Sequence, residues 1–225
     1  MKAFIVYPTY ETIDNQTYVF LYGRLENNQS FATINKFSPY FYVRKKDIKK
    51  IPKKYSNKET KLTNFKGEPV IKISFQNNSE LNNLFKELHK EIEIYEADLR
   101  PHYRFIIDNN FLGTINIEGD YVSSEKIDRV YNGPIIAPSN FKPKLKVLSL
   151  DTESDKNGNL YCIGLYNEDY KKVLMITDKK LKNAISCKDE SDCLDKLRQQ
   201  IKKIDPDIIT GWNVIDHDFG LLRNS

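Results

Sequence analysis

Three carboxylates in the last third of the chain have the types and spacing of a metal-dependent catalytic site. Asp151 and Glu153 stand two residues apart directly after a mostly apolar segment, residues 145–150. Residues two apart on a strand project from the same face, so both carboxylates can aim at one point. Asp218 follows a second apolar segment, residues 206–212, and can bring a third carboxylate to the end of a neighbouring strand. Hard divalent cations prefer oxygen ligands, so these acids predict a phosphoryl-transfer site with two Mg²⁺ or Mn²⁺ ions about 3.5–4 Å apart.

Other interpretations of the same residues stay open. An Asp-x-Glu pair alone is typical of an exposed surface, and only its position after an apolar segment favours a metal site, because buried charges need cations or donors. Asp216 is a competing ligand two residues before Asp218. His217 has the character of a loop histidine more than of a metal ligand.

The elements around the carboxylates read as an α/β domain. Strands are expected at 145–150, 160–166, 173–177 and 206–212, and an amphipathic helix at 191–204. Three strands, a helix and a fourth strand is the order of a ribonuclease-H-like nuclease core. Many α/β domains share this pattern, so the pattern alone does not single out that fold.

The first part of the chain reads as a small α+β domain. Its expected strands are residues 3–7, 16–22, 31–34, 40–44 and 70–75. A turn is expected at Asp14 and Asn15, and a helix with Ser79 as its N-cap and apolar residues at helical spacing up to Ile92. Residues 132–143 are rich in Gly and Pro and are the candidate linker. We therefore expect two domains, residues 1–144 and 145–225, the second one incomplete.

Composition and charge limit the class of protein. With 40% hydrophobic and 12% aromatic residues, the chain can form a packed core. It has no signal-peptide core and no apolar segment long enough to span a membrane, so a soluble protein is expected. Three cysteines without a CxxC pair fit a reduced, cytoplasmic compartment.

The basic excess lies in the first part of the chain. Residues 1–145 hold 22 Lys and Arg against 17 Asp and Glu, and residues 146–225 hold 13 against 14. Residues 44–54 contain seven basic residues and one acid, and Arg44, Lys45 and Lys46 begin this run. Such a run is commonly a solvated face, and the alternative is contact with nucleic-acid phosphates that weakens with salt.

Several motifs in a fixed order resemble family B DNA polymerases. Residues 150–154 (LDTES) resemble the first exonuclease motif of that family, and residues 212–219 (WNVIDHDF) resemble the second. Residues 158–165 (GNLYCIGL) and 95–101 (YEADLRP) are similar to the bacterial DNA polymerase II branch. Residues 37–43 (FSPYFYV) are similar to a strand of the N-terminal domain. The resemblance runs from about residue 31 to the end of the chain.

The resemblance implies roles for individual residues. Asp151 would be the ligand shared by two metals, Glu153 would bind one metal and orient the attacking water, and Asp218 would hold the second metal. Asn213 would support the loop or touch the single strand. One departure is His217, which stands where the family usually has an aromatic residue before the Asp.

The resemblance also implies what lies outside this chain. The third exonuclease motif and the polymerase carboxylates are expected beyond Ser225, so the chain is expected to be an inactive, monomeric fragment. Its implied partners are a DNA template-primer and a single-stranded 3′ end, in the cytoplasm or nucleoid and away from membranes, with a sliding clamp as a further partner through regions absent here.

The N-terminal domain of the family lies beside the template strand. In archaeal members it holds a pocket that senses uracil, and Tyr7, Pro39 and Tyr40 fall where such a pocket would be built. Aromatic residues on small β domains mostly pack, and the bacterial branch is not expected to share this pocket. Core packing therefore stays open beside contact with the template.

Two other functions stay open as well. One is a stand-alone ribonuclease-H-like 3′–5′ exonuclease with an unusual N-terminal extension. The other is a non-catalytic nucleic-acid-binding module with a decayed nuclease core, against which the presence of Asp151, Glu153 and Asp218 argues.

Overall fold

The computed structural model describes residues 1–224 of the 225-residue chain, and the chain divides into two compact units. The first unit is Met1–Pro143 and the second is Lys144–Ser225. The boundary expected from the sequence lies one residue further along, between 144 and 145. Each unit has its own hydrophobic core, and the first unit has two.

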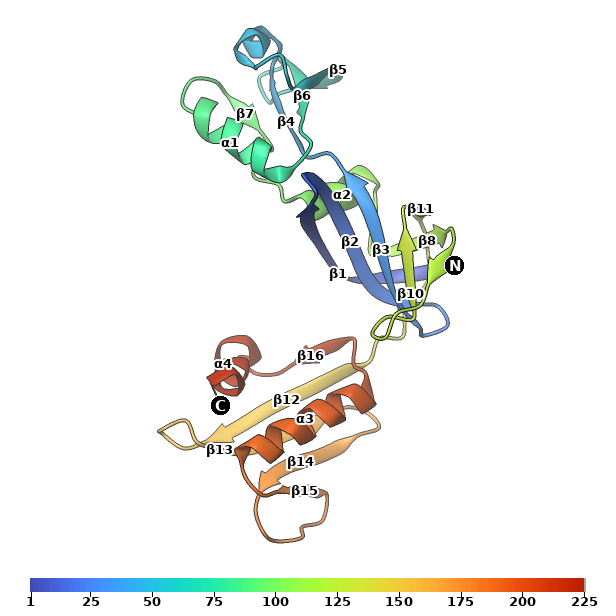
Figure 1. The fold of residues 1–225 in the computed structure, drawn as a ribbon, viewed down its shortest axis with the longest axis vertical. Coiled ribbons are helices and arrows are strands. Elements are labelled where there is room, and N and C mark those ends of the chain that lie inside the picture. The colour runs from blue at the N-terminus through green and yellow to red at the C-terminus, as the bar shows by residue number, and fades with distance from the viewer. Residues whose placement is uncertain (225) are drawn as a thin grey trace. The chain divides into compact units, whose positions relative to one another are not determined.

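A seven-stranded sheet forms most of the first unit, in the order β11-β8-β1-β2-β3-β10-β9 (Figure 1). Its strands are β1 (Lys2–Ile13), β2 (Gln16–Leu25), β3 (Ser30–Phe37), β8 (Thr114–Glu118), β9 (Tyr121–Val122), β10 (Arg129–Asn132) and β11 (Ile135–Pro138). Asp14 and Asn15 both have positive φ, as a two-residue hairpin turn requires, so the turn expected between β1 and β2 is confirmed.

Part of the segment that we expected to be a linker belongs to this sheet. The strand β11 pairs with β8, and β10 pairs in parallel with β3. Pro138 is tolerated because β11 is an edge strand, where a missing backbone donor costs no ladder hydrogen bond. The linker prediction for 132–143 is therefore wrong for its first half, and residues 139–146 carry no regular element.

A four-stranded sheet, β5-β6-β4-β7, forms the rest of the first unit. The elements here are β4 (Tyr40–Arg44), the 3₁₀ turn η1 (Lys45–Lys50), β5 (Ser56–Thr63), β6 (Pro69–Ser74), α1 (Asn78–Leu88) and β7 (Ile94–Tyr95). The helix α2 (Pro101–Asp108) follows and packs on β1 and β2 of the larger sheet. The helix α1 buries Leu81, Leu84 and Leu88 in this sheet's core. Its N-cap is Asn77, whose side chain accepts a hydrogen bond from the backbone N of Glu80, so the prediction of Ser79 as the cap is wrong.

The second unit is a five-stranded sheet, β15-β14-β13-β12-β16, with a helix across one face (Figure 1). Its elements are β12 (Val147–Ser154), β13 (Leu160–Tyr166), β14 (Lys171–Ile176), β15 (Ala184–Cys187), α3 (Glu190–Ile204), β16 (Ile208–Thr210), the π-helical turn η2 (Val214–Asp218) and α4 (Phe219–Asn224). The strand β13 pairs antiparallel with both β12 and β14, and β16 runs parallel to β12.

Side-chain alternation gives this sheet a buried and an open face. On β12, Leu148, Leu150 and Thr152 are buried, whereas Asp151 and Glu153, which alternate with them, are exposed. The buried face forms one core with Cys193 and Leu197 of α3. Among the described residues, no helix has the length and apolar composition that a membrane crossing requires.

Candidate functional site

Asp151 and Glu153 lie on the open face of the second sheet, side by side along β12. Directly opposite them on β13 are Gly164 and Cys162. Burial first, and then the charges of Glu153 and Asp151, raise the pKa of the Cys162 thiol. The two carboxylates thus share a face, as their spacing predicted, and they create a negative local field there.

Asp218 is bound to the same strand through Thr152. One oxygen of its carboxylate, Oδ1, accepts hydrogen bonds from the backbone N and from Oγ1 of Thr152, both at 2.7 Å. The side chain is only 1% exposed, and its other oxygen, Oδ2, is buried without a hydrogen-bond partner. The structure therefore ties Asp218 to the residue between Asp151 and Glu153.

The described residues do not assemble a finished metal site. No three His, Cys, Asp or Glu side chains in the described part of the chain form a group able to hold a metal ion. The donor chemistry nevertheless fits a hard cation, because all three predicted side chains offer carboxylate oxygens. A buried carboxylate oxygen without a partner, such as Oδ2 of Asp218, carries a desolvation penalty in free energy, and a bound cation would compensate for it.

The neighbours of Asp218 are exposed. Asp216 points to solvent, and His217 is largely exposed with its Nδ1 3.9 Å from Oδ1 of Asp218. The contact with β12 is made by Asp218, which favours Asp218 over Asp216 as the third carboxylate. Asn213 is exposed and begins η2 with a positive φ of 55°, and its carbonyl accepts a hydrogen bond from the backbone N of His217.

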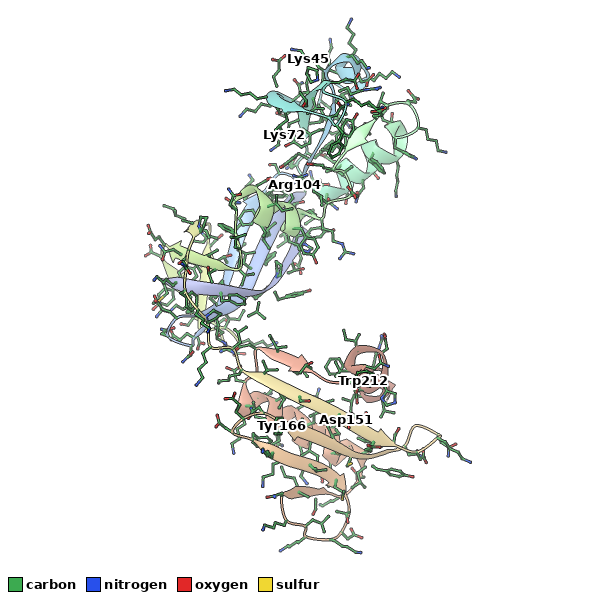
Figure 2. All side chains as sticks on the ribbon, turned by 180° about the vertical axis from the view of Figure 1, so that it is seen from behind. Lys45, Lys72, Arg104, Asp151, Tyr166 and Trp212 are labelled. Atoms are coloured by element: carbon green, nitrogen blue, oxygen red, sulfur yellow. The ribbon has the colours of Figure 1, made fainter. Side chains whose placement is uncertain are left out.

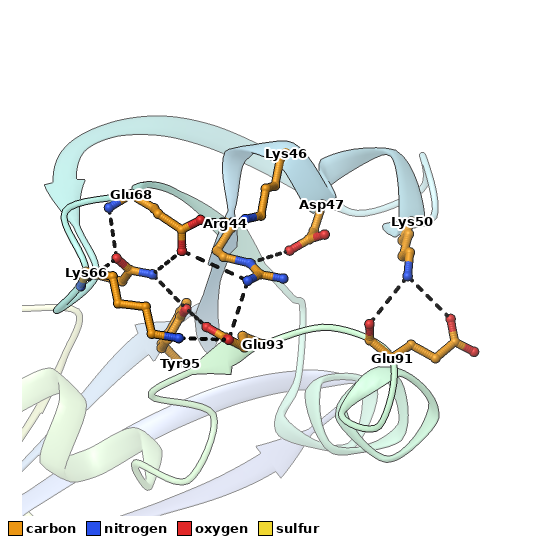
Figure 3. A network of polar contacts seen from close by, with 10 residues as sticks. Arg44, Lys46, Asp47, Lys50, Lys66, Glu68, Glu91, Glu93 and Tyr95 are labelled. Carbon is orange, nitrogen blue, oxygen red and sulfur yellow. Dashed lines mark hydrogen bonds and ion pairs between the residues drawn. The ribbon is translucent and has the colours of Figure 1, made fainter.

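The basic run of the first unit is largely paired with acids (Figure 3). Nε of Arg44 lies 2.7 Å from Asp47, Nζ of Lys45 lies 2.7 Å from Glu59, and Lys46 pairs with Glu68. Lys46 and the amide of Asn64 hold the pKa of the Glu68 carboxyl below its ordinary value. The local excess of positive charge is therefore offset by acids from η1, β5 and the turn before β6, and phosphate contact by Arg44, Lys45 and Lys46 stays a prediction.

Comparisons with known proteins relate the chain to DNA polymerases. No family model matches the chain. It is 29% identical over 172 residues to DNA polymerase II of Escherichia coli K12, and 26% identical over 253 residues to a DNA polymerase of Archaeoglobus fulgidus. The family B DNA polymerase of Pyrobaculum calidifontis matches 99% of this chain with a TM-score of 0.76 at 18% identity. The resemblance to family B DNA polymerases is confirmed.

The chain spans less than a third of the length of the polymerases that it matches. The alignments cover 72% and 99% of this chain but only 21% and 30% of the two curated relatives, and 32% of the solved structure. The fold that the chain shares with that solved structure is mixed α/β and rich in strands.

Tyr7, Pro39 and Tyr40, which the resemblance places near a template pocket, differ from one another in how exposed they are. Tyr7 is 61% exposed, and its ring stacks on Tyr22 at a centroid distance of 6.4 Å. Tyr40 is 5% exposed and donates to both carboxylate oxygens of Asp108, at 2.7 and 2.8 Å. Burial and Asp108 raise the pKa of Tyr40.

The environments of Pro39 and Tyr40 favour core packing, the alternative that the sequence left open. Pro39 is buried, and its carbonyl accepts a hydrogen bond from the backbone N of Phe75. Nζ of Lys72 lies 3.4 Å from the centroid of the Tyr40 ring, and Arg104 also lies over that ring. Both residues are thus packed within the first unit, whereas Tyr7 is exposed, and contact of the three residues with the template stays a prediction.

One exposed residue beside the site was missed by the sequence reasoning. Trp212, the only tryptophan of the chain, is 92% exposed on the loop between β16 and η2 (Figure 2). Ile215, three residues later, is also exposed. The sequence signal that could have identified this residue is a single Trp next to Asn213. Its indole can serve as a spectroscopic probe of this region.

Proposed function

We propose that the chain is part of a DNA-directed DNA polymerase with a proofreading 3′–5′ exonuclease. The confirmed resemblance supports the polymerase part, since two curated relatives carry that name. We assign residues 1–144 to a template-side domain and residues 145–225 to the first part of a ribonuclease-H-like exonuclease domain. The DNA substrate would be a template-primer whose mispaired 3′ end is hydrolysed.

The topology of the second unit supports the exonuclease assignment. Three antiparallel strands, β12, β13 and β14, come first, and the helix α3 then leads to β16, which is parallel to β12. This is the order expected for a ribonuclease-H-like core. The short strand β15 is an addition at the edge of the sheet.

The contact between Thr152 and Asp218 carries the proposal. It connects the two sequence motifs across 66 residues and holds the second-motif carboxylate against the strand that bears Asp151 and Glu153. A buried carboxylate with one fixed and one unpartnered oxygen is suited to binding a cation.

In the proposed reaction each side chain has its own task. Asp151 would be the ligand shared by two ions, Glu153 would orient the attacking water and Asp218 would hold the second ion. Two Mg²⁺ or Mn²⁺ ions, when bound, supply Lewis acidity and lower the pKa of water, so no side-chain nucleophile is needed. Asn213 and Trp212 lie exposed where they can meet the single strand.

Binding of Mn²⁺ to the 225-residue chain tests this proposal. Isothermal titration should give Mn²⁺ binding that Asp151→Asn weakens at least tenfold, because a shared ligand is lost. Asp178→Asn, an exposed acid of the same unit, removes the same charge and should leave the affinity within about twofold. Equal affinities for wild type and Asp151→Asn would reject the metal site and favour a non-catalytic nucleic-acid-binding module.

The same titration separates the two candidates for the third carboxylate. Asp218→Asn should weaken Mn²⁺ binding more than Asp216→Asn does, since Asp218 is buried and hydrogen-bonded to Thr152 of β12, whereas Asp216 is exposed. The reverse order would assign the ligand to Asp216.

A further inference from the structure

Lys72 of β6 lies on the face of the four-stranded sheet that is turned away from α1. Its neighbours along the strand, Ile71 and Ile73, are buried in the core that this sheet shares with α1. Because side chains alternate along a strand, Lys72 points to the opposite face, where it is half-buried. Burying an ammonium group costs free energy, so the surroundings of this amine decide its charge.

A second lysine stands directly opposite Lys72. Strand register places Lys58 of β5 on one side of Lys72 and Tyr42 of β4 on the other. Lys58 is exposed, and like charges directly opposite each other on antiparallel strands are destabilising. Loss of the proton from one of the two amines relieves this repulsion.

Groups from β4 and α2 also surround the amine (Figure 2). Nζ of Lys72 lies 3.4 Å from the centroid of the Tyr40 ring, and the guanidinium carbon of Arg104 lies 4.7 Å from the same centroid. The carboxylate of Asp108 accepts its hydrogen bonds from the Tyr40 hydroxyl. Within residues 1–224, Arg104 pairs with Glu96, whereas no acid forms an ion pair with Lys72. The amine thus lies among cations and an aromatic ring, without a carboxylate partner of its own.

These surroundings favour the neutral amine. Burial is the largest cause and lowers the pKa of Lys72, Asp108 raises it, and Arg104 and Lys58 lower it further. The Tyr40 ring attracts the ammonium form, but this ring is shared with Arg104. A desolvated lysine beside other cations is the kind of amine that can act as a nucleophile.

We propose that Lys72 is a modification site, acylated at Nζ by acyl phosphates. The lone pair of the neutral amine attacks the carbonyl carbon, so an N–C bond forms and the C–O bond to phosphate breaks. Inorganic phosphate leaves with the electron pair of that bond, and the proton released by the nitrogen passes to it through water. Lys58, about 5 Å away across the ladder, holds the phosphate of the incoming reagent.

The product of this reaction is an uncharged amide. Acylation removes the like charge opposite Lys58 and takes one positive charge from this face of the sheet. The site lies in the first unit and involves none of the three candidate metal ligands of the second unit, so it goes beyond the proposed polymerase and exonuclease.

Acetyl phosphate is the probe that tests the proposal. The 225-residue chain is incubated with it at neutral pH and digested with chymotrypsin, and acetylation is quantified at each lysine by mass spectrometry. Lys72 should be acetylated at least fivefold faster than Lys171, an exposed lysine of β14 that stands opposite Tyr166 and 5.1 Å from its ring centroid. An equal or slower rate at Lys72 would overturn the proposal.

The pH dependence of the two rates separates activation of the amine from access to it. The rate at Lys72 should level off at a lower pH than the rate at Lys171, because a larger fraction of Lys72 is already neutral. Two rates that level off at the same pH would contradict the proposed activation.

Matched variants test the pair of lysines across the ladder. Lys58→Gln should slow acetylation of Lys72 at least fivefold at neutral pH and shift its pH profile upward, because the opposing cation and the phosphate contact are both lost. Lys61→Gln removes the same charge from another exposed position of β5 and should leave the rate within twofold. Equal losses in the two variants would refute the role of Lys58.

A reagent without phosphate tests the choice of acyl phosphates. N-hydroxysuccinimidyl acetate should still react faster with Lys72 than with Lys171, but with at least twofold lower selectivity, since Lys58 then has no phosphate to hold. Equal selectivity with both reagents would overturn the assignment of acyl phosphates as the modifying class.

Discussion

Thr152 is the residue through which the candidate exonuclease motifs meet. It faces the core while its neighbours Asp151 and Glu153 face solvent, so one strand presents a hydrogen-bond donor inward and two carboxylates outward. A buried carboxylate such as Asp218 needs donors, because leaving a charged group unsatisfied costs more than an ordinary hydrogen bond contributes.

Replacing Thr152 by Val tests this dependence. The change keeps the shape of the side chain but removes the Oγ1 donor to Asp218. We expect the free energy of unfolding of the second unit to fall by about 1.5–3 kcal/mol, the range for a hydrogen bond to a charged group. Urea denaturation followed by amide signals of residues 144–224 measures it. Thr210→Val, at an exposed position on β16, is the control, and an equal effect in both variants would contradict the role of Thr152.

At the scale of elements, local sequence signals identified the helix α1 but not the residue that caps its N-terminus. The apolar spacing of Leu81, Leu84 and Leu88 predicted α1, but three polar residues at its beginning can each act as an N-cap. Asn77 is the cap because it is also held by Asn15 in the turn between β1 and β2, at 2.7 Å. A contact with a distant turn therefore decided a local choice.

Removing the cap should destabilise the first unit. Asn77→Ala should lower its free energy of unfolding by about 1–2 kcal/mol, since the side chain accepts from the Glu80 backbone and is buried. Ser79→Ala, at the exposed position first expected to be the cap, should change it by less than about 0.5 kcal/mol. Chemical denaturation followed by amide signals of residues 1–143 distinguishes them, and a larger loss for Ser79→Ala would restore the earlier assignment.

The ion pairs of η1 should limit how strongly this element attracts nucleic acid. Glu59→Gln frees Lys45, so affinity for a single strand should rise and the salt dependence should steepen by about 0.7 in log–log slope, the value for one added phosphate contact. Fluorescence anisotropy with a labelled oligodeoxythymidine at several salt concentrations measures this slope. Glu87→Gln on α1 changes the net charge equally without freeing Lys45, and an identical slope in both variants would show that η1 does not touch phosphate.

The molecule as a whole consists of two units with separate cores, and the candidate carboxylates all lie in the second. No group of three metal-binding side chains is formed among the described residues. A two-metal reaction needs such a group of ligands, so exonuclease activity of this chain is a separate question from Mn²⁺ binding.

We therefore expect the 225-residue chain to lack brisk exonuclease activity. Labelled single-stranded DNA incubated with the chain and Mn²⁺ should stay intact over the time in which a proofreading enzyme degrades it. Asp151→Asn serves as the control for contaminating nucleases. Degradation by wild type that disappears in Asp151→Asn would show that the described carboxylates suffice.

Structural features that depend only on neighbouring residues could be predicted from the sequence. The alternation along 147–154 placed Asp151 and Glu153 on one face, and the Asp14-Asn15 turn joined two strands, because side-chain period and turn preference depend on neighbouring residues alone. The helix expected at 191–204 is α3, which begins one residue earlier. The order of motifs also identified the resemblance to family B.

Features that depend on distant partners were decided only by the tertiary structure. The polar strand β5 exists because β6 supplies its hydrogen bonds, and β11 exists because β8 does. Burial of Tyr40 against Asp108, neutralisation of Lys45 by Glu59, and the Thr152–Asp218 contact likewise join residues far apart in the chain. The sequence alone thus determined which residues could do chemistry and which way they face, whereas long-range packing decided which of them are free to do it.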